Sequence, residues 1–214
     1  MKKESMVSII IPNYNGERFI KQTIDSVLTN THIPFELIVI DSNSTDKSKY
    51  ILERYTDNHH VILHYLTSNR GPTYATNVGV DIAQSPFIIS LGYDMEVAPN
   101  WLHHTLNYMK SHQHVGAGQL KVLRNDRRTT YDSAGEYITR WGFLSERARE
   151  ATDEGQFDSP TQLFSGKGTA LIFRKDVYTR VGGFDHVVCS WNTRDGLIRK
   201  KFFTPAINIE HDGL

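Results

Sequence analysis

Hydrophobic positions in the first part of the chain follow two patterns, continuous runs and helical spacing. Residues 7–11 and 36–40 are apolar runs rich in β-branched side chains, which is typical of strands buried on both faces of a parallel sheet. Between them, residues 18–28 place apolar side chains at the spacing of one helix face. The pattern predicts a strand, a crossover helix and a second parallel strand.

The alternation of strands and helices continues toward the middle of the chain. A capping signal in residues 44–46 precedes one predicted helix, and Pro99 precedes another. Because strands and helices alternate throughout, we expect a doubly wound α/β fold with a central, mostly parallel sheet flanked by helices. The further predicted strands are 61–66 and 87–91, and the further predicted helices are 47–55, 74–83 and 100–111.

The periodicity weakens between residues 124 and 160, where polar, charged and glycine residues dominate. We expect short or irregular elements there, inserted into one domain that spans residues 1–214. Order returns with a predicted strand at 168–174 and a short helix at 176–181, which Gly182 and Gly183 end. The abrupt end after a predicted strand suggests that the natural chain continues past Leu214.

Composition narrows the class of protein. A chain of 214 residues with 39% hydrophobic side chains can bury one sizeable core. Lys plus Arg equal Asp plus Glu at 24 each, so no overall charge favours nucleic acid as a partner. A lone Cys189 and the absence of an apolar run of about 18 residues favour a cytoplasmic protein without a spanning helix. The alternative is a protein in peripheral contact with the inner face of a membrane.

Polar segments follow four of the predicted strands, at residues 12–16, 41–44, 67–71 and 92–96. The carboxyl ends of parallel strands form the ligand crevice of such a sheet. Asp41 can accept hydrogen bonds from ribose or a base, Tyr14 can stack on a base, and Arg70 can pair with phosphate. Each segment alone could be an ordinary polar turn. Four segments on one edge favour a binding site.

These residues resemble family 2 glycosyltransferases, in a likeness that covers nearly the whole chain. The segments that show this resemblance are residues 7–15 (VSIIIPNYN), 38–41 (IVID) with 44–46 (STD), 69–71 (NRG) with 77–79 (NVG), Trp101, 132–135 (DSAG), 154–158 (EGQFD), Arg174 and 181–185 (VGGFD). The resemblance implies a GT-A fold, Rossmann-like, with a nucleotide-binding half at about residues 1–120 and an acceptor-side half at about residues 121–214.

The resemblance also implies which residues bind a nucleoside diphosphate sugar. Pro12, Tyr14 and Asp41 would border the nucleoside, and residues 69–71 would lie beside the diphosphate. Asp94 would stand near a divalent cation, Mg²⁺ or Mn²⁺, which suits carboxylate ligands. The implied donor-site set is Pro12, Tyr14, Asn15, Asp41, Asn69, Arg70, Gly71 and Asn77.

Two departures from the family pattern bear on metal binding and catalysis. Gly92 replaces the first acid of the usual pair, which leaves Asp94 in register and makes the metal uncertain. Arg194 replaces the Glu of the Glu-Asp pair, so Asp195 is the remaining candidate for the general base. Asp195 can equally be a surface residue paired with Arg194.

His211 and Trp191 complete the candidates. His211 follows a predicted strand, where family members often carry a histidine near the metal or diphosphate, and a lone histidine is otherwise more often structural. Trp191 could stack on a sugar ring, although buried core tryptophans are commoner.

The resemblance implies an inverting enzyme that moves a sugar from its nucleoside diphosphate to a hydroxyl of a glycan or a lipid-linked acceptor. The alternative is a degenerate member of the same fold that binds a sugar nucleotide or glycan without turnover, which Gly92 and Arg194 motivate. A nicotinamide-dependent dehydrogenase is set aside because residues 12–16 lack its glycine fingerprint.

Overall fold

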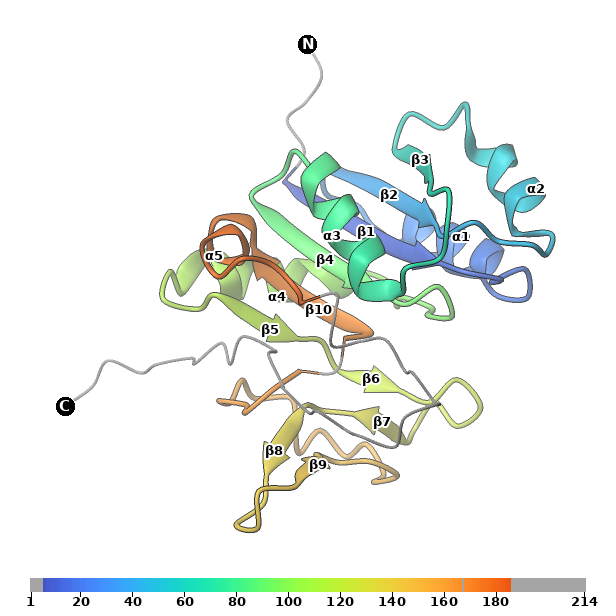
Figure 1. Ribbon diagram of the computed structural model, residues 1–214. Coiled ribbons are helices and arrows are strands. Elements are labelled where there is room, and N and C mark those ends of the chain that lie inside the picture. The colour runs from blue at the N-terminus through green and yellow to red at the C-terminus, as the bar shows by residue number, and fades with distance from the viewer. Residues whose placement is uncertain (1–5, 167, 186–214) are drawn as a thin grey trace.

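The computed structural model describes residues 6–166 and 168–185 as a layered α/β unit with a smaller strand-rich part beside it (Figure 1). Within these residues, six strands form one sheet in the order β3-β2-β1-β4-β10-β5. Neighbours among β1 to β4 run parallel, and β10 is antiparallel to both β4 and β5. The strands are β1 Val7–Asn13, β2 Phe35–Asp41, β3 Val61–Tyr65, β4 Phe87–Leu91, β5 Ala117–Gln119 and β10 Ala170–Arg174.

The strand order reverses between β1 and β4. The chain passes from β1 outward through β2 to β3, then returns to add β4 on the other side of β1. Connections therefore leave β1 and β4 in opposite directions, which opens a crevice at their carboxyl ends. Pairing of β1 with β4 ends at Ile10 and Ser90, whereas pairing with β2 continues to Asn13 and Asp41. Pro12 lies in this last stretch, where β1 has a neighbour on one side only.

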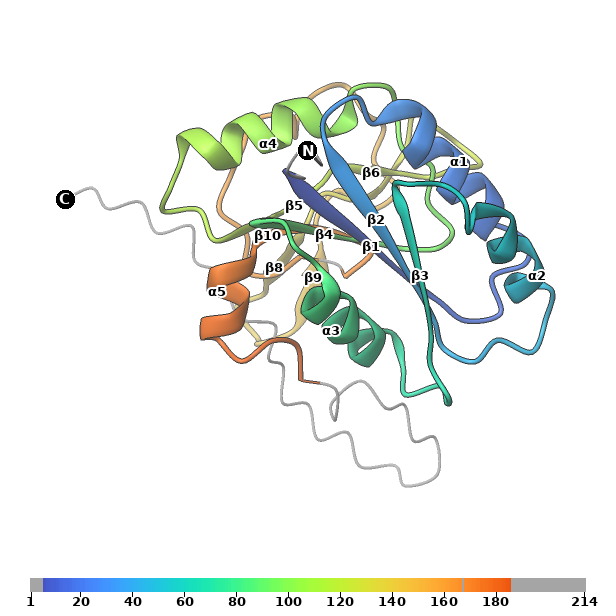
Figure 2. The ribbon, with the colours of Figure 1, turned by 90° about the horizontal axis from the view of Figure 1, so that it is seen from above.

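Helices cover both faces of the sheet, with α1 and α4 on one face and α3 and α5 on the other (Figure 2). Alternate residues of β1 face the two layers, Val7 and Ile9 toward the core shared with α1 and α4, and Ile10 toward α3. This two-sided burial explains the continuous apolar run. The helices are α1 Ile20–Asn30, α2 Ser48–Leu52, α3 Pro72–Ile82, α4 Trp101–Ser111 and α5 Lys175–Arg180, with a 3₁₀ turn at Glu53–Tyr55.

A glycine sets how closely α3 lies on the sheet. A Cβ atom at Gly79 would lie 2.4 Å from Cγ2 of Ile10. Any larger residue would push α3 away from β1 or displace Ile10. Close packing of α3 against β1 therefore explains why a glycine occupies the last position of the NVG segment.

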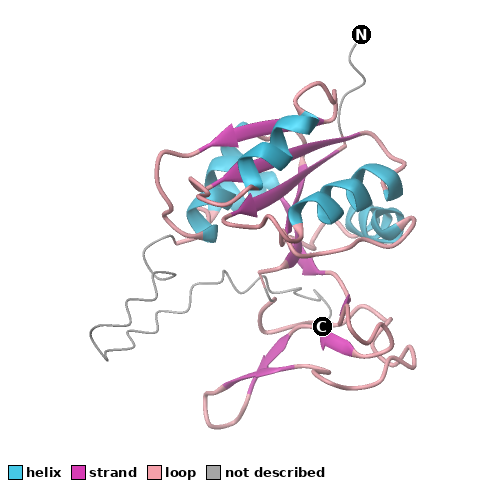
Figure 3. Ribbon diagram, turned by 90° about the vertical axis from the view of Figure 1, so that its right-hand side faces the viewer, coloured by secondary structure: helices cyan, strands magenta, loops and turns pink. Residues whose placement is uncertain are grey.

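The region after β5 contains short antiparallel pairs (Figure 3). Strand β6 (Val122–Leu123) pairs with β7 (Tyr131–Ser133), and β8 (Glu136–Ile138) pairs with β9 (Leu144–Glu146). The expectation of short or irregular elements in residues 124–160 is confirmed. Strands β5 and β6 were not predicted, because runs of three and two residues carry too little periodicity to detect.

Predicted boundaries agree with the observed elements within a few residues. The largest difference is in residues 47–55, where α2 ends at Leu52 and a 3₁₀ turn follows. Among the described helices, none combines the length and the apolar character that crossing a bilayer requires. The single-domain assignment and its division into two halves stay predictions.

Candidate functional site

The loops after β1 and β2 hold each other in place at the carboxyl edge of the sheet. The backbone N–H of Asn15 donates to Ser44 Oγ at 2.9 Å, and the Thr45 N–H donates to Asn15 Oδ1 at 2.8 Å. Asn15 adopts a left-handed backbone with φ of 51°, which asparagine tolerates better than most residues. The predicted donor residue Asn15 therefore also joins the two loops.

A second link joins the same loops slightly farther out. The Glu17 N–H donates to Asp46 Oδ2 at 2.9 Å, and the Lys47 N–H donates to Glu17 Oε2 at 2.8 Å. Asp46 Oδ1 accepts from the Ser48 N–H at 2.9 Å, a local hydrogen bond across the N-cap position of α2, which is Lys47. Partial burial raises the pKa of the Asp46 carboxyl, but the hydrogen bonds from Ser48 and from the Glu17 N–H outweigh burial and hold the pKa below its ordinary value.

Asp41 lies beneath these loops with no exposed surface. Its Oδ2 accepts from Asn13 Nδ2 at 2.8 Å and from Ser44 Oγ at 2.6 Å, and its Oδ1 accepts from the Ser44 N–H at 2.9 Å. These three hydrogen bonds compensate the free-energy cost of burying the Asp41 carboxylate. No ion pair between described residues includes Asp41. The structure thus gives Asp41 an organising position, and its contact with a nucleoside stays a prediction.

Asn13 is the residue at this edge that sequence reasoning missed. It is buried, and its Oδ1 has no hydrogen-bond partner among the described residues. A Cβ atom at Gly16 would lie 2.2 Å from that oxygen, so glycine is required where the loop turns over Asn13. A polar residue at the end of an otherwise apolar strand was the available signal. The next residue, Tyr14, is 42% exposed, so its side chain is accessible from solvent.

The loop after β4 contacts the loop after β1, which closes the switch point on its second side. A Cβ atom at Gly16 would lie 2.9 Å from Cδ2 of Tyr93, and Thr23 of α1 donates its hydroxyl to the Tyr93 carbonyl at 2.6 Å. The predicted convergence of strand ends is therefore observed for the loops after β1, β2 and β4.

Asp94 lies in this loop and is exposed. A Cβ atom at Gly92 would lie 2.9 Å from Asp94 Oδ1, so the Asp94 carboxylate folds back over the glycine. Glu96 points elsewhere, accepting from Gln22 at 3.0 Å and from Arg128 at 2.7 Å. Although one residue separates Asp94 from Glu96 in the sequence, the two carboxylates do not meet at one ligand.

The residues described by the structure contain no group of three or more His, Cys, Asp or Glu side chains suited to a metal ion. A cation such as Mg²⁺ is often held by one or two carboxylates together with substrate phosphates. A single exposed carboxylate at Asp94 fits that kind of site and does not fit one made by protein alone.

Residues 69–71 lie where β3 passes into α3. Asn69 Oδ1 accepts from the Gly71 N–H at 2.9 Å, and Gly71 has φ of 88°, a conformation that favours glycine. Pro72 then begins α3, whose N-terminus carries a partial positive charge. Arg70 lies over the Tyr74 ring, with Cζ 3.8 Å from the ring centroid. This corner therefore combines a cation with a helix N-terminus, the requirements of an anion site.

Asn77 faces a different partner. Its Nδ2 donates to the Phe184 carbonyl at 2.8 Å, and its Oδ1 accepts from the Phe184 N–H at 3.2 Å and from the Tyr178 hydroxyl. Gly182 and Gly183, with φ of 86° and 76°, turn the chain back so that Phe184 reaches α3. Asn77 therefore joins α3 to the VGGFD segment, and its assignment to the donor site stays a prediction.

The candidates Asp195, His211, Trp191 and Arg194 lie outside the described residues.

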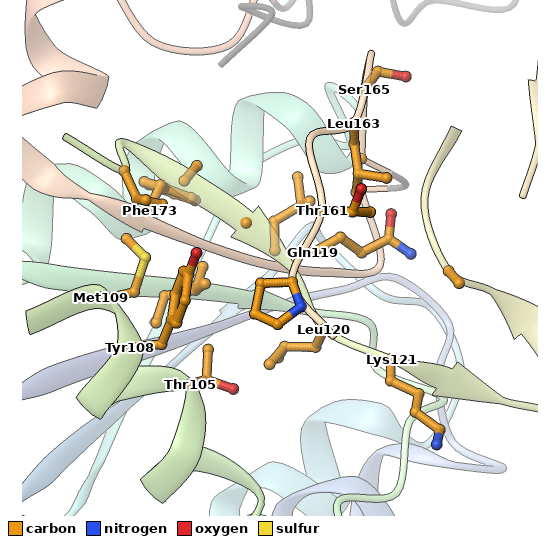
Figure 4. A pocket seen from close by; sticks show the side chains of 18 of the residues that line it. Thr105, Tyr108, Met109, Gln119, Leu120, Lys121, Thr161, Leu163, Ser165 and Phe173 are labelled. Carbon is orange, nitrogen blue, oxygen red and sulfur yellow. The ribbon is translucent and has the colours of Figure 1, made fainter. Parts of the chain in front are cut away.

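A cavity of about 620 Å³ lies in another part of the molecule, along β5 and between α4 and the segment before β10 (Figure 4). Tyr108, Met109 and Phe173 lie at its apolar end, and Lys121 lies at its polar end. Lys121 forms ion pairs with Asp153 and Asp158, each at 2.7 Å. Burial lowers the pKa of Lys121, but hydrogen bonds to the two carboxylates outweigh burial and raise it. None of the predicted donor residues lines this cavity.

Three relatives share sequence with the chain. An uncharacterised glycosyltransferase of Haemophilus influenzae is 39% identical over 105 residues, 49% of this chain and 42% of that protein. A putative teichuronic acid biosynthesis glycosyltransferase of Bacillus subtilis, TuaG, is 34% identical over 107 residues, which are 49% of this chain and 42% of that protein. A glucosyl-dolichyl phosphate glucuronosyltransferase of Haloferax volcanii is 22% identical over 182 residues, 84% of this chain and 56% of that protein. The chain thus spans about half, or less, of the length of these relatives.

Two solved structures share the fold at low sequence identity. S. aureus TarS in complex with UDP superposes with a TM-score of 0.64 and 22% identity, over 87% of this chain and 52% of that one. The mannosyltransferase PcManGT of Pyrobaculum calidifontis, in complex with GDP-Man and Mn²⁺, superposes with a TM-score of 0.61 and 19% identity. The match covers 86% of this chain and 49% of that one. The expected GT-A fold is confirmed.

The family model described as glycosyl transferase family 2 matches residues 8–182. With the strand order and the convergent loops, this match shows that the chain belongs to glycosyl transferase family 2.

Proposed function

We propose that this chain carries the donor-binding core of an inverting glycosyltransferase, which moves a sugar from a nucleoside diphosphate sugar to a hydroxyl of a glycan or lipid-linked acceptor. The observation that carries the proposal is the meeting of the loops after β1, β2 and β4 at the switch point of the sheet. Related folds bind UDP in TarS and GDP-Man with Mn²⁺ in PcManGT, which supports a uridine or guanosine diphosphate sugar as donor.

In this proposal, the nucleoside lies on the exposed surface above Asp41. Tyr14 stacks on the base, while Asp41, Asn13 and Ser44 hold the loops in a fixed shape. Because the loops are already bonded to each other, little conformational entropy is lost when the nucleoside binds. Pro12 borders the same surface.

The diphosphate lies between the N-terminus of α3 and the loop after β4. Arg70 and the helix N-terminus supply positive charge on one side. On the other side, Asp94 would hold a divalent cation, which would supply positive charge to the leaving diphosphate. Asp195 removes the proton of the acceptor hydroxyl, and the sugar is attacked from the face opposite the departing diphosphate.

Binding of the donor is tested first by thermal shift and calorimetry with UDP, GDP, UDP-GlcNAc and GDP-mannose, each with and without Mn²⁺. We expect a shift with one nucleotide, and weaker binding on Arg70→Ala. Arg54→Ala is the matched control, because Arg54 lies over Tyr50 as Arg70 lies over Tyr74 and belongs to the 3₁₀ turn after α2, outside the proposed diphosphate site. Equal affinities of the two variants would overturn the role of Arg70.

Asp94 and Gly92 are tested together. Asp94→Asn should remove the Mn²⁺ dependence of nucleotide binding, with Asp57→Asn as an exposed control. Gly92→Asp restores the acidic pair and forces the Asp94 carboxylate to move, because the two would otherwise collide. We expect tighter Mn²⁺-dependent binding in that variant. An unchanged Mn²⁺ dependence in both variants would place the metal elsewhere.

Catalysis is tested with Asp195→Asn, which should abolish transfer and keep donor binding. Nucleotide binding by the wild-type chain without transfer or hydrolysis, across many acceptors, would instead favour a degenerate binding protein.

A further inference from the structure

The β8–β9 hairpin is the most exposed apolar feature among the described residues. Four of its large side chains are open to solvent within seven positions, with exposed fractions of 49% for Tyr137, 47% for Ile138, 72% for Trp141 and 69% for Phe143. Figures 1 and 3 show the hairpin projecting away from the sheet and its helices. Apolar side chains gathered at a projecting tip mark an interaction surface.

The tip has a defined shape. The Thr139 N–H donates to the Phe143 carbonyl at 2.8 Å, the Gly142 N–H donates to the Thr139 carbonyl at 2.9 Å, and Gly142 has φ of 80°. This closed turn places Arg140 and Trp141 at its two central positions, with the Arg140 Cζ 4.7 Å from the Trp141 ring. Binding through the tip therefore requires little ordering of the backbone.

The chemistry of the tip restricts its partner. From residue 137 to residue 144 the one ionisable charge is Arg140, and no acid occurs. The Thr139 hydroxyl already accepts from the Phe143 N–H at 3.1 Å. Ile138 and Phe143 offer no polar group to a glycan, and a tip-to-tip contact between two copies would bring two Arg140 side chains together.

We propose that the β8–β9 hairpin docks the protein on an anionic lipid surface, with Trp141 and Phe143 inserted at the level of the headgroups and Arg140 beside their phosphates. Trp and Tyr favour that level because their rings are apolar at one end and polar at the other. The hairpin belongs to the acceptor-side half, so docking would bring a lipid-linked acceptor close. That last point rests on the proposed function, whereas lipid binding does not.

The test is flotation of the full chain with vesicles of phosphatidylcholine, alone or mixed with phosphatidylglycerol. Burial of each large aromatic side chain contributes on the order of tenfold in affinity, so the double variant Trp141→Ser/Phe143→Ser should lose binding by about a hundredfold. Arg140→Gln should weaken binding to the anionic vesicles about fivefold and leave binding to phosphatidylcholine unchanged. Tyr50→Ser, which removes an aromatic side chain 62% exposed on α2, is the matched control and should bind as the wild type does.

Three results would overturn the proposal. The first is that the wild-type chain floats with neither vesicle, and the second is that the double variant floats as well as the wild type while both unfold at the same temperature. Loss of self-association in the double variant by analytical ultracentrifugation, without any vesicle binding, would assign the tip to a protein contact. Because flotation needs no donor or acceptor, these outcomes are separate from failure of the transfer assays.

Discussion

The loops of the proposed donor site and the β8–β9 hairpin are built in opposite ways. The loops after β1 and β2 place a buried carboxylate, Asp41, under a layer of mutual hydrogen bonds, and they expose few apolar side chains. The hairpin has two strands of three residues each and leaves its large apolar side chains in solvent. A surface that must hold a small ligand in one geometry benefits from buried support, whereas a surface that meets a soft or extended partner does not need it.

The largest expected effect follows from removal of the buried carboxylate. Asp41→Ala removes the acceptor of the Ser44 N–H and of the Ser44 hydroxyl, and it leaves the Asn13 amide with only the longer of its two hydrogen bonds, to Ser44 Oγ at 3.3 Å. We expect a loss of about 2 to 4 kcal/mol in the free energy of unfolding, together with loss of nucleotide binding. Urea unfolding and calorimetry measure the two effects. Asp57→Ala is the exposed control, and equal stability of the two variants would show that the loops do not depend on Asp41.

A smaller effect is expected at the contact between α3 and the VGGFD segment. Asn77→Ala removes the donor to the Phe184 carbonyl and the acceptor of the Tyr178 hydroxyl, and it leaves the Phe184 N–H with the Tyr178 hydroxyl as its acceptor. We expect a loss of about 1 to 2 kcal/mol in unfolding free energy, with nucleotide affinity unchanged because the amide is already used inside the protein. Weaker nucleotide binding at unchanged stability would instead assign Asn77 to the donor, as the sequence predicts.

Asp46 links the two loops through a carboxylate whose pKa is lowered in the folded state. A lowered pKa means that the contribution to stability is present above the unfolded value, near 3.8, and is lost as the pH falls through the folded value. Asp46→Asn should therefore reduce stability near neutral pH, by less than Asn77→Ala, and the difference from wild type should shrink in acid. Urea midpoints from about pH 7 to about pH 3 measure this trend, and a difference that grows in acid would contradict it.

The smallest effect on folding is expected at the hairpin. Trp141→Ser and Phe143→Ser remove side chains that are mostly in solvent, so unfolding free energies should stay within about 0.5 kcal/mol of wild type. A larger loss in urea unfolding would mean that these side chains pack against the protein in solution.

Much of the fold could be predicted from local pattern. The runs at residues 7–11 and 36–40 and the helical spacing between them correspond to β1, β2 and α1. The polar segments at strand ends could be placed at one edge because parallel strands share their carboxyl ends. The sites of Asp41 and Tyr14 follow from this rule alone.

The remaining features depend on contacts that no local pattern encodes. Asn77 and Phe184 are 107 residues apart, and they meet because two glycines turn the chain after α5 back toward α3. In the sequence, Gly92 stands where the family has the first acid of a pair and Asp94 is the second. Only the structure shows that the Asp94 carboxylate lies over the glycine.

The sequence by itself determined the order of strands and helices, the edge of the sheet that carries the polar loops, and the family, because these depend on residue type and local spacing. Tertiary structure decided that Asp41 is fully buried, that Glu96 turns to Arg128 and Gln22, and that Trp141 and Phe143 stand in solvent. Burial and hydrogen-bond partners depend on how elements distant in the sequence pack against one another. The periodicity of a sequence cannot predict them, because it shows only which face of an element is apolar.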